Sequence, residues 1–264
     1  MYQCEDCRTS FVDPVPSHDA LADFYKRYHL PTSEGGGYAI AEVRRGEDIA
    51  AMLRMVRRYA CRDGSRVLDV GCGKGFFVKA CRDAGLDAHG IDLSSSAIEY
   101  ATRELAVSAV AGALADRKSQ LGTFDAVTLW ATIEHLAEPR QMLADIHTVL
   151  RPGGRLFLDT GIGDDWLDRC LPGKVSWYDP PQHLFVFSKD GMGRVLAQAG
   201  FRVVHLDTNY ERSVARRAAK TLRNSVCAVG LRLVSSAARL KSGPFEITRY
   251  ALGNAMVAVA ERPD

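Results

Sequence analysis

Residues 66–75 read RVLDVGCGKG, and this stretch decides the fold. Its first five residues are mostly apolar, as in a buried strand, and from Phe76 onward the pattern is typical of a helix. Gly71, Gly73 and Gly75 fall between the two, where glycine lets the chain turn tightly and lets a ligand approach the backbone closely. We predict a strand–turn–helix unit that binds a ligand, although a tight turn without a ligand also accounts for the glycines alone.

A carboxylate follows at the end of the next predicted strand. Asp92 lies about 20 residues after Gly73, the place from which an acidic side chain accepts both hydroxyls of a ribose. Asp69 lies inside the first strand, where a dinucleotide-binding fold needs no carboxylate. We interpret Asp69 as a group that orders the turn and faces a positive charge on the ligand. That combination fits a nucleoside carrying an amino acid better than a pyrophosphate.

Outward from this unit, strands and helices alternate. The hydrophobic patterns predict strands at 66–70, 87–92, 107–111, 124–130, 155–160, 201–207 and 255–260, and helices at 39–60, 76–84, 95–105, 139–150 and 188–199. Such alternation produces βαβ units and a parallel sheet with helices on both faces. We therefore predict an α/β fold with a doubly wound, mostly parallel seven-stranded sheet, whose ligands bind at the carboxyl ends of the strands.

The composition is that of an ordinary globular protein. The 264 residues include 34 Lys and Arg, 32 Asp and Glu, and 47% apolar residues, which excludes wholesale disorder, collagen and a coiled coil. No apolar run is long enough to span a bilayer. Seven scattered cysteines and no start typical of a secretory signal indicate reduced thiols, so we expect a cytoplasmic protein.

Four stretches, in order and spacing, resemble the motifs of class I S-adenosylmethionine-dependent methyltransferases: VLDVGCGKG, GIDLS, FDAVTLWATIEHLAEP and LRPGGRL. The resemblance covers about residues 60–207. It is closest to the branch that includes the ubiquinone-pathway O-methyltransferases and many natural-product or saccharide methyltransferases, which residues 183–201 also match. It implies a Rossmann-like methyltransferase fold, S-adenosylmethionine as cofactor and S-adenosylhomocysteine as product. The acceptor would be a small molecule, with oxygen the favoured atom.

The family's motifs imply which residues contact the cofactor. Asp69, Gly71, Cys72 and Gly73 would surround its methionine part, and Asp92 would hold the ribose. The remaining implied contacts are Leu93, Ala113 and Leu114 at the adenine, Trp130 at the end of the fourth strand, and Tyr38 from the leader.

Three of these cofactor contacts have alternatives. Many relatives carry an acidic residue where this chain has Ala113 and Leu114, which leaves the adenine contact open. Trp130 fits a core aromatic equally well. Tyr38 fits either a lid that contacts the cofactor or simple packing.

Two histidines are candidates for catalysis. Methyl transfer from a sulfonium is an in-line displacement, so an enzyme chiefly aligns the acceptor and removes its proton. His183, in a proline-rich loop, and His135, in the pair Glu134-His135, are candidate catalytic bases because imidazole titrates near neutral pH. Alternatively, Glu134 and His135 orient the loop or the cofactor, and His183 caps the next element. We expect no metal site, since no cluster of carboxylates is apparent.

The first 60 residues form a leader before the methyltransferase domain, residues 61–264. In the relatives this segment folds over the cofactor and substrate, which implies lid helices. Cys4 and Cys7 have the spacing of half a zinc knuckle, but a structural zinc needs four ligands, and Cys61 and Cys72 are badly placed to complete the set. We therefore expect a remnant knuckle without metal.

A basic helical insertion occupies residues 211–241, between the last two predicted strands. From residue 212 to residue 241 the chain carries eight Lys or Arg residues and no acidic residue, with apolar residues at helical spacing. The insertion would cover the substrate pocket, attract an anionic substrate, or rest on an anionic membrane surface, and we favour the first. Nucleic acid is not expected, because aromatic residues do not interleave the charges.

Other functions stay open at this level. The acceptor atom could be nitrogen or carbon of a lipid-linked or phosphorylated substrate. An NAD-dependent oxidoreductase shares the glycine turn and its acidic partner, but this chain lacks the G-x-G-x-x-G spacing. A non-catalytic regulatory protein that binds the cofactor is a further alternative. The sequence does not indicate an oligomeric state.

Overall fold

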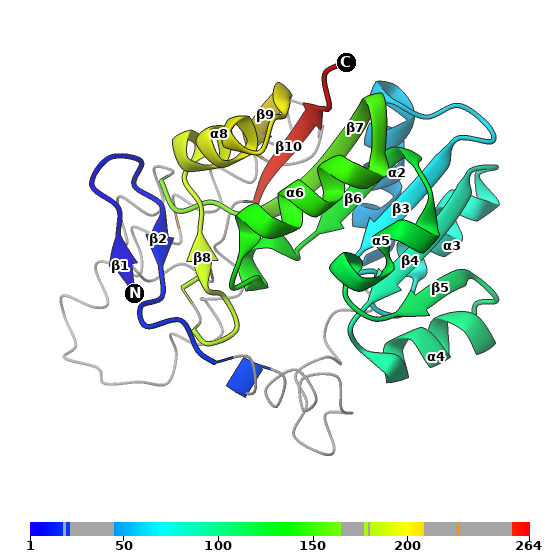
Figure 1. The fold of residues 1–264 in the computed structure, drawn as a ribbon, viewed down its shortest axis with the longest axis horizontal. Coiled ribbons are helices and arrows are strands. Elements are labelled where there is room, and N and C mark those ends of the chain that lie inside the picture. The colour runs from blue at the N-terminus through cyan, green and yellow to red at the C-terminus, as the bar shows by residue number, and fades with distance from the viewer. Residues whose placement is uncertain (18–19, 22–44, 165–176, 179, 209–225, 227–254) are drawn as a thin grey trace.

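The computed structural model describes residues 1–17, 20–21, 45–164, 177–178, 180–208, 226 and 255–264 (Figure 1). Its main element is a seven-stranded sheet in the order β5-β4-β3-β6-β7-β10-β9. The strands are β3 (Arg66–Val70), β4 (Asp87–Asp92), β5 (Ser108–Ala111), β6 (Phe124–Trp130), β7 (Leu150–Gly161), β9 (Arg202–Thr208) and β10 (Ala255–Glu261). Strand β10 runs antiparallel to β7 and β9, and the other pairs are parallel. The predicted mostly parallel sheet is confirmed.

Helices cover both faces of this sheet. One core cluster contains side chains of α2, α3 and α4, and the other contains side chains of α5, α6 and α8. The helices are α2 (Arg45–Tyr59), α3 (Phe76–Asp83), α4 (Ser95–Arg103), α5 (Leu114–Leu121), α6 (Pro139–Val149) and α8 (Lys189–Gln198). The sheet is therefore doubly wound, as predicted.

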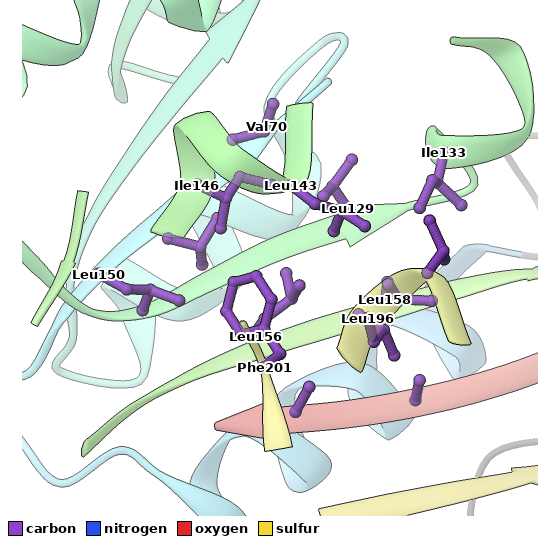
Figure 2. Close-up of a cluster of buried hydrophobic side chains, with 14 of the residues drawn as sticks. Val70, Leu129, Ile133, Leu143, Ile146, Leu150, Leu156, Leu158, Leu196 and Phe201 are labelled. Carbon is purple, nitrogen blue, oxygen red and sulfur yellow. The ribbon is translucent and has the colours of Figure 1, made fainter. Parts of the chain in front are cut away.

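Strand β7 shows why the parallel strands are apolar on both sides. Leu156 and Leu158 point into the cluster that Leu143 of α6 and Leu196 of α8 complete, whereas Phe157 belongs to the opposite cluster (Figure 2). Successive side chains of a strand alternate between faces, so a strand covered by helices on both faces buries every residue.

The strand order reverses between β3 and β6. The chain moves outward from β3 to β4 and β5, and then returns to pair β6 with the other side of β3. Loops that leave the carboxyl ends of β3 and β6 therefore diverge, and in open α/β sheets ligands bind in the crevice between such loops. The strands that carry the predicted site residues meet at this position.

A second, three-stranded sheet was not predicted. It consists of β1 (Tyr2–Gln3), β2 (Ser10–Phe11) and β8 (Phe185–Val186), in the antiparallel order β1-β2-β8. The leader thus begins as a strand pair that binds the segment after His183, with Val12 N–H donating to Leu184 O at 2.9 Å. Strands of two residues are too short to show a periodic pattern.

Other differences from the sequence expectations are local. Helix α5 was not predicted because only Leu114 of its residues is buried, which leaves no apolar periodicity. Strand β7 begins at Leu150, earlier than predicted, and its pairing with β6 shifts register near Gly153, where φ is 72°. The predicted cap at Ser94 is confirmed, since its Oγ accepts the Ala97 N–H at 3.2 Å.

Several expectations fall outside the described residues. These are most of the predicted lid, including Tyr38, and the basic insertion apart from residue 226. No helix in the described part of the chain combines the length and apolarity needed to cross a membrane.

Candidate active site

The glycine turn after β3 has the backbone conformation that only glycine adopts easily. Gly71, Gly73 and Gly75 have φ angles of 77°, 52° and 78°. A Cβ added to Gly71 would lie 2.5 Å from Oγ1 of Thr132, and one added to Gly75 would lie 2.9 Å from Cβ of Ala101. The turn is therefore packed closely against Thr132 and Ala101, and a side chain at Gly71 or Gly75 would not fit.

Asp92 is held at the end of β4 by two backbone groups of the site. Its Oδ2 accepts the Gly73 N–H at 2.8 Å and its Oδ1 accepts the Ser94 N–H at 2.8 Å. A carboxylate oxygen accepts two hydrogen bonds, so each oxygen retains one acceptor position. The carboxylate is thus oriented by the turn and still able to accept two ligand hydroxyls. Leu93, beside it, is 73% exposed.

Asp69 is buried in β3, directly opposite Thr128 of β6, whose hydroxyl donates to its Oδ1 at 2.6 Å. Burial raises the pKa of Asp69 to about 7, and the charges of Asp92 and Asp159 act in the same direction. Among the described residues, no Lys or Arg forms an ion pair with Asp69. A cationic ligand group would stabilise this buried charge, as an amino-acid ammonium or a sulfonium does.

The structure places the other predicted cofactor residues as follows. Trp130 ends β6 with its ring edge-on to Phe77, 5.4 Å between centroids, so it contributes to the core on that face. Cys72 is half-buried in the turn, and burial raises the pKa of its thiol. Ala113 is the N-cap of α5, and Leu114 is fully buried in the core below it.

A second group of polar side chains lies past β6, in the short 3-10 helix η3 (Ile133–His135) and in the segment before β8. His135 Nδ1 lies 2.7 Å from Gln182 O, and Leu184 N–H donates to Glu134 O at 2.8 Å. These bonds connect η3 to the two residues that flank His183, Gln182 and Leu184. The rings of His135 and His183 are therefore held 4.9 Å apart, centroid to centroid.

Both imidazoles are oriented by carbonyl groups. His183 Nδ1 lies 3.0 Å from Trp177 O, as His135 Nδ1 lies beside Gln182 O. A carbonyl oxygen only accepts, so Nδ1 carries the proton in each neutral ring and Nε2 carries the lone pair. Burial lowers the pKa of His135, and the Gln182 and Ala131 carbonyls oppose this by favouring the protonated ring.

Glu134 is 2% exposed, and neither carboxylate oxygen has a hydrogen-bond partner among the described residues. Burial raises its pKa to about 7. One ligand atom from each of Glu134, His135 and His183 lies within 4.8 Å of the others. The sequence suggested both histidines, but not that Glu134 would be buried beside them.

Asp159 is a site residue that the sequence reasoning missed. It lies in β7, opposite Trp130, and its Oδ1 accepts the Ala131 N–H at 2.6 Å. Ala131 has a φ of 47°, which is uncommon for a residue with a side chain, and this bond helps to hold it there. The sequence did contain one indication of this role: Asp159 is an acidic residue near the carboxyl end of a predicted strand.

The N-terminal cysteines lie in the turn between β1 and β2. Both are free thiols of intermediate exposure, and hydrogen bonds from the backbone of Cys7 and Asp6 lower the pKa of Cys4. Within the described ranges, no third His, Cys, Asp or Glu joins the pair to form a ligand group.

Comparison with known sequences agrees with this geometry. A family model described as "Methyltransferase domain" matches residues 43–206. The chain is 34% identical over 161 residues to the ubiquinone biosynthesis O-methyltransferase of Methylococcus capsulatus, covering 53% of this chain and 67% of that protein. It is 30% identical over 132 residues to the mitochondrial ubiquinone biosynthesis O-methyltransferase of Schizosaccharomyces pombe, covering 47% of this chain and 48% of that protein.

Solved structures show the same fold. A Burkholderia thailandensis 1,6-didemethyltoxoflavin-N1-methyltransferase with bound S-adenosylhomocysteine superposes with a TM-score of 0.59 at 17% identity, covering 100% of this chain and 99% of that chain. The [4+2]-cyclase SpnF superposes with a TM-score of 0.62 at 20% identity, covering 96% and 99%. The family match spans more than half of the chain. The chain therefore belongs to the methyltransferase domain family, as a class I S-adenosylmethionine-dependent methyltransferase.

Proposed function

We propose that the protein methylates an oxygen of a small molecule, in the class of natural products, saccharides or anionic metabolites. The carrying observation is that the glycine turn, Asp92 and His135 follow the neighbouring strands β3, β4 and β6 of one sheet, and that His183 lies beside His135. A site of this form positions a nucleoside cofactor beside groups that can accept a proton. The names of the two ubiquinone-pathway relatives support oxygen as the acceptor atom.

The residues present fit S-adenosylmethionine. Asp92 would accept the ribose hydroxyls with its two remaining acceptor positions, and Leu93 would cover the adenine. The N–H groups that open α3 have no side-chain cap, so they are available to the carboxylate of the amino-acid part. Asp69 would face a positive group of that part. When bound, the cofactor supplies a methyl group already activated on a sulfonium.

His183 or His135 would take the proton of the acceptor hydroxyl. Each ring presents Nε2 as its proton acceptor because its Nδ1 proton is held by a carbonyl. The lowered pKa of His135 keeps that ring neutral at physiological pH, which a general base requires. When ionised, Glu134 places negative charge next to the two rings and would stabilise an imidazolium formed by this transfer.

Two alternatives to this proposal, a different acceptor atom and a protein without transferase activity, are outcomes of the test below. The basic residues 212–241 would suit a phosphorylated or lipid-linked acceptor methylated at nitrogen or carbon. A protein that binds the cofactor without methyl transfer is the second alternative, since the cyclase SpnF has the same fold.

The test has two stages. Calorimetric titration of the full chain with S-adenosylmethionine, S-adenosylhomocysteine and NAD should show binding of the first two only. Incubation with methyl-labelled cofactor and a panel of hydroxylated, amino and phosphorylated small molecules should then label hydroxylated acceptors. Binding without transfer to any acceptor would support the regulatory alternative, and label on nitrogen or carbon alone would overturn oxygen as the acceptor atom.

A further inference from the structure

Ala131, directly after β6, has a backbone conformation that its own side chain disfavours. Its φ is 47°, in the left-handed region, where a Cβ atom crowds the neighbouring carbonyl oxygen. The side chain is exposed, so its packing does not offset this cost. Strained backbone persists only where the surrounding structure fixes it, and a group outside Ala131 must therefore hold it.

Asp159 of β7 is the group that holds Ala131. Trp130 and Asp159 lie side by side in the pairing of β6 with β7, and Asp159 Oδ1 accepts the Ala131 N–H at 2.6 Å. This distance is short for an N–H···O bond, and a carboxylate acceptor makes such bonds about twice as strong as neutral ones. Asp159 is 9% exposed, which limits competition from water.

The conformation of Ala131 sets the direction of the next residue, Thr132, which contacts the glycine turn. Thr132 Oγ1 lies 3.0 Å from Trp130 O and 3.5 Å from Val70 O, at the end of β3. The same oxygen would lie 2.5 Å from a Cβ added to Gly71. Thr132 therefore fills the space that the missing side chain of Gly71 leaves, and it packs directly on the turn.

Thr132 also begins the segment that carries His135. It is the N-cap of η3, and its carbonyl accepts the His135 N–H at 3.1 Å. One residue thus contacts the loop that follows β3 and starts the helix that follows β6. These are the two loops that diverge where the strand order reverses.

We propose that Asp159 is a positioning residue that sets both loops of the active site through Ala131. By keeping Ala131 in the left-handed region, Asp159 holds Thr132 against Gly71 and fixes the start of η3. Asp159 acts in this way without touching the cofactor. That the glycine turn binds the cofactor rests on the proposed function, whereas the coupling of the two loops does not. Loss of Asp159 should lower cofactor affinity and turnover together.

The first experiment measures S-adenosylmethionine affinity by calorimetry in full-length variants of Asp159 and Ala131. Asp159→Ala should weaken binding by about 10-fold, because an alanine without this partner populates the required conformation only in part. Asp159→Ala/Ala131→Gly should bind within about 3-fold of the unsubstituted protein, because glycine adopts a positive φ readily. Full loss of affinity in this double variant overturns the proposal.

Asp159→Asn separates the hydrogen bond from the charge. The charge of Asp159 acts on Asp69, and asparagine removes it but retains an oxygen that accepts the Ala131 N–H. Asp159→Asn should therefore bind S-adenosylmethionine within about 3-fold of the unsubstituted protein, since the positioning bond is kept. A loss as large as that of Asp159→Ala would assign the effect to charge and overturns the proposal.

Ala106→Gly is the matched control for the recovery. Ala106 is also an exposed alanine with a positive φ, 51°, but it lies between α4 and β5, at the opposite edge of the sheet from the carboxyl ends of the strands. Ala106→Gly relieves the same kind of strain and should not recover the affinity of Asp159→Ala. Recovery equal to that from Ala131→Gly would indicate a general gain in stability, which overturns the proposal.

The second experiment needs no substitution at Asp159, and so covers the case in which Asp159→Ala does not fold. In ¹⁵N-labelled unsubstituted protein, the Ala131 amide hydrogen should exchange at least about 10-fold more slowly than in an unstructured peptide, although the residue is exposed. Exchange at the peptide rate overturns the proposal. If Asp159→Ala folds, the amide resonances of Gly71 and His135 should shift in its ligand-free form and return in Asp159→Ala/Ala131→Gly.

The positioning role and the proposed function fail separately when Asp92→Ala is measured beside these variants. If Asp92→Ala weakens S-adenosylmethionine binding and Asp159→Ala does not, the positioning role alone is overturned. If neither weakens binding, the assignment of the glycine turn and Asp92 to the cofactor is overturned. In that case the ligand-free resonances still decide the coupling, and unchanged Gly71 and His135 signals in Asp159→Ala overturn it.

Discussion

The two halves of the candidate active site are built in opposite ways. The cofactor half, the glycine turn and Asp92, comes from one continuous stretch in which backbone N–H groups bind the key carboxylate. The acceptor half joins Glu134 and His135 to His183, which lies on a segment far along the chain. Each half contains a buried carboxylate whose pKa is raised to about 7, but of the two only Asp69 accepts a hydrogen bond from a hydroxyl of a described residue.

The difference indicates a division of labour. Under the proposed function, the half made of adjacent residues binds the part of the ligand that is common to the family. The half assembled from distant segments would then provide chemistry that depends on the acceptor. Substitutions should therefore separate cofactor binding from turnover.

The largest expected effect is on turnover. His183→Gln should lower kcat by about 10²- to 10⁴-fold, the usual contribution of a positioned base, while the S-adenosylmethionine affinity stays unchanged. The measurement is single-turnover methyl transfer beside calorimetry, once an acceptor has been found. His147→Gln should leave both quantities unchanged. A similar loss of S-adenosylmethionine affinity in His183→Gln would show that the two halves do not act independently.

The next effect is on cofactor affinity. Asp92→Ala should weaken S-adenosylmethionine binding by about 100-fold or more, since two hydroxyl contacts to a charged group are lost at about 1.5–3 kcal/mol each. Calorimetry measures this directly, with the exposed Asp116→Ala as the matched control. Affinity within a few-fold of the unsubstituted protein would remove Asp92 from the site.

A smaller effect concerns stability and pH. The pKa of Asp69 is about 7 in the folded protein and 3.8 in its ordinary environment, so the folded state binds its proton more tightly. Asp69 therefore lowers the free energy of unfolding as the pH rises from about 4 to about 7, by up to about 4 kcal/mol. Asp69→Asn should unfold at higher denaturant concentration than the unsubstituted protein at pH 8, with the difference shrinking at pH 5.

Urea denaturation at several pH values checks this, and Asp116→Asn is the control. Parallel stability curves for Asp69→Asn and the unsubstituted protein would show that burial does not penalise this carboxylate. Asp69→Asn should also weaken S-adenosylmethionine binding, because the charge that opposes folding is the one that faces the ligand.

The smallest expected effect comes from the cap beside Asp92. Ser94→Ala removes the side-chain acceptor of the Ala97 N–H at the start of α4 and should lower stability by about 1 kcal/mol. Cofactor affinity should change little, since Asp92 is oriented by the backbone N–H of residue 94, which the substitution retains. A loss as large as that of Asp92→Ala would mean that the cap, rather than the backbone, orients the carboxylate.

Local pattern was enough to predict the main sheet and the positions of the glycine turn and of Asp92 within it. The strands at 66–70, 87–92 and 124–130 were predicted to the residue, and each begins two residues after a glycine. Helix α5 was missed because it buries little, and the small β1-β2-β8 sheet because its strands have two residues each. An element that is stabilised only by tertiary contacts shows no periodic pattern of apolar residues in the sequence, so it cannot be predicted from that pattern.

The same reason explains what was missed at the site. Asp69 and Asp92 could be predicted because their positions within strands define their surroundings. The burial of Glu134 beside both histidines depends on the bonds from Gln182 and Leu184, which join segments that are distant along the chain. Asp159 was missed because its role is to hold the N–H of Ala131, a contact between neighbouring strands.

The most direct test of the account is calorimetric titration of S-adenosylmethionine and NAD into the unsubstituted protein, Asp92→Ala and His183→Gln. We predict that the unsubstituted protein and His183→Gln bind S-adenosylmethionine equally, that Asp92→Ala binds it at least about 100-fold more weakly, and that none binds NAD. Binding of NAD without S-adenosylmethionine, or equal S-adenosylmethionine affinity in all three proteins, would contradict the assignment of the site.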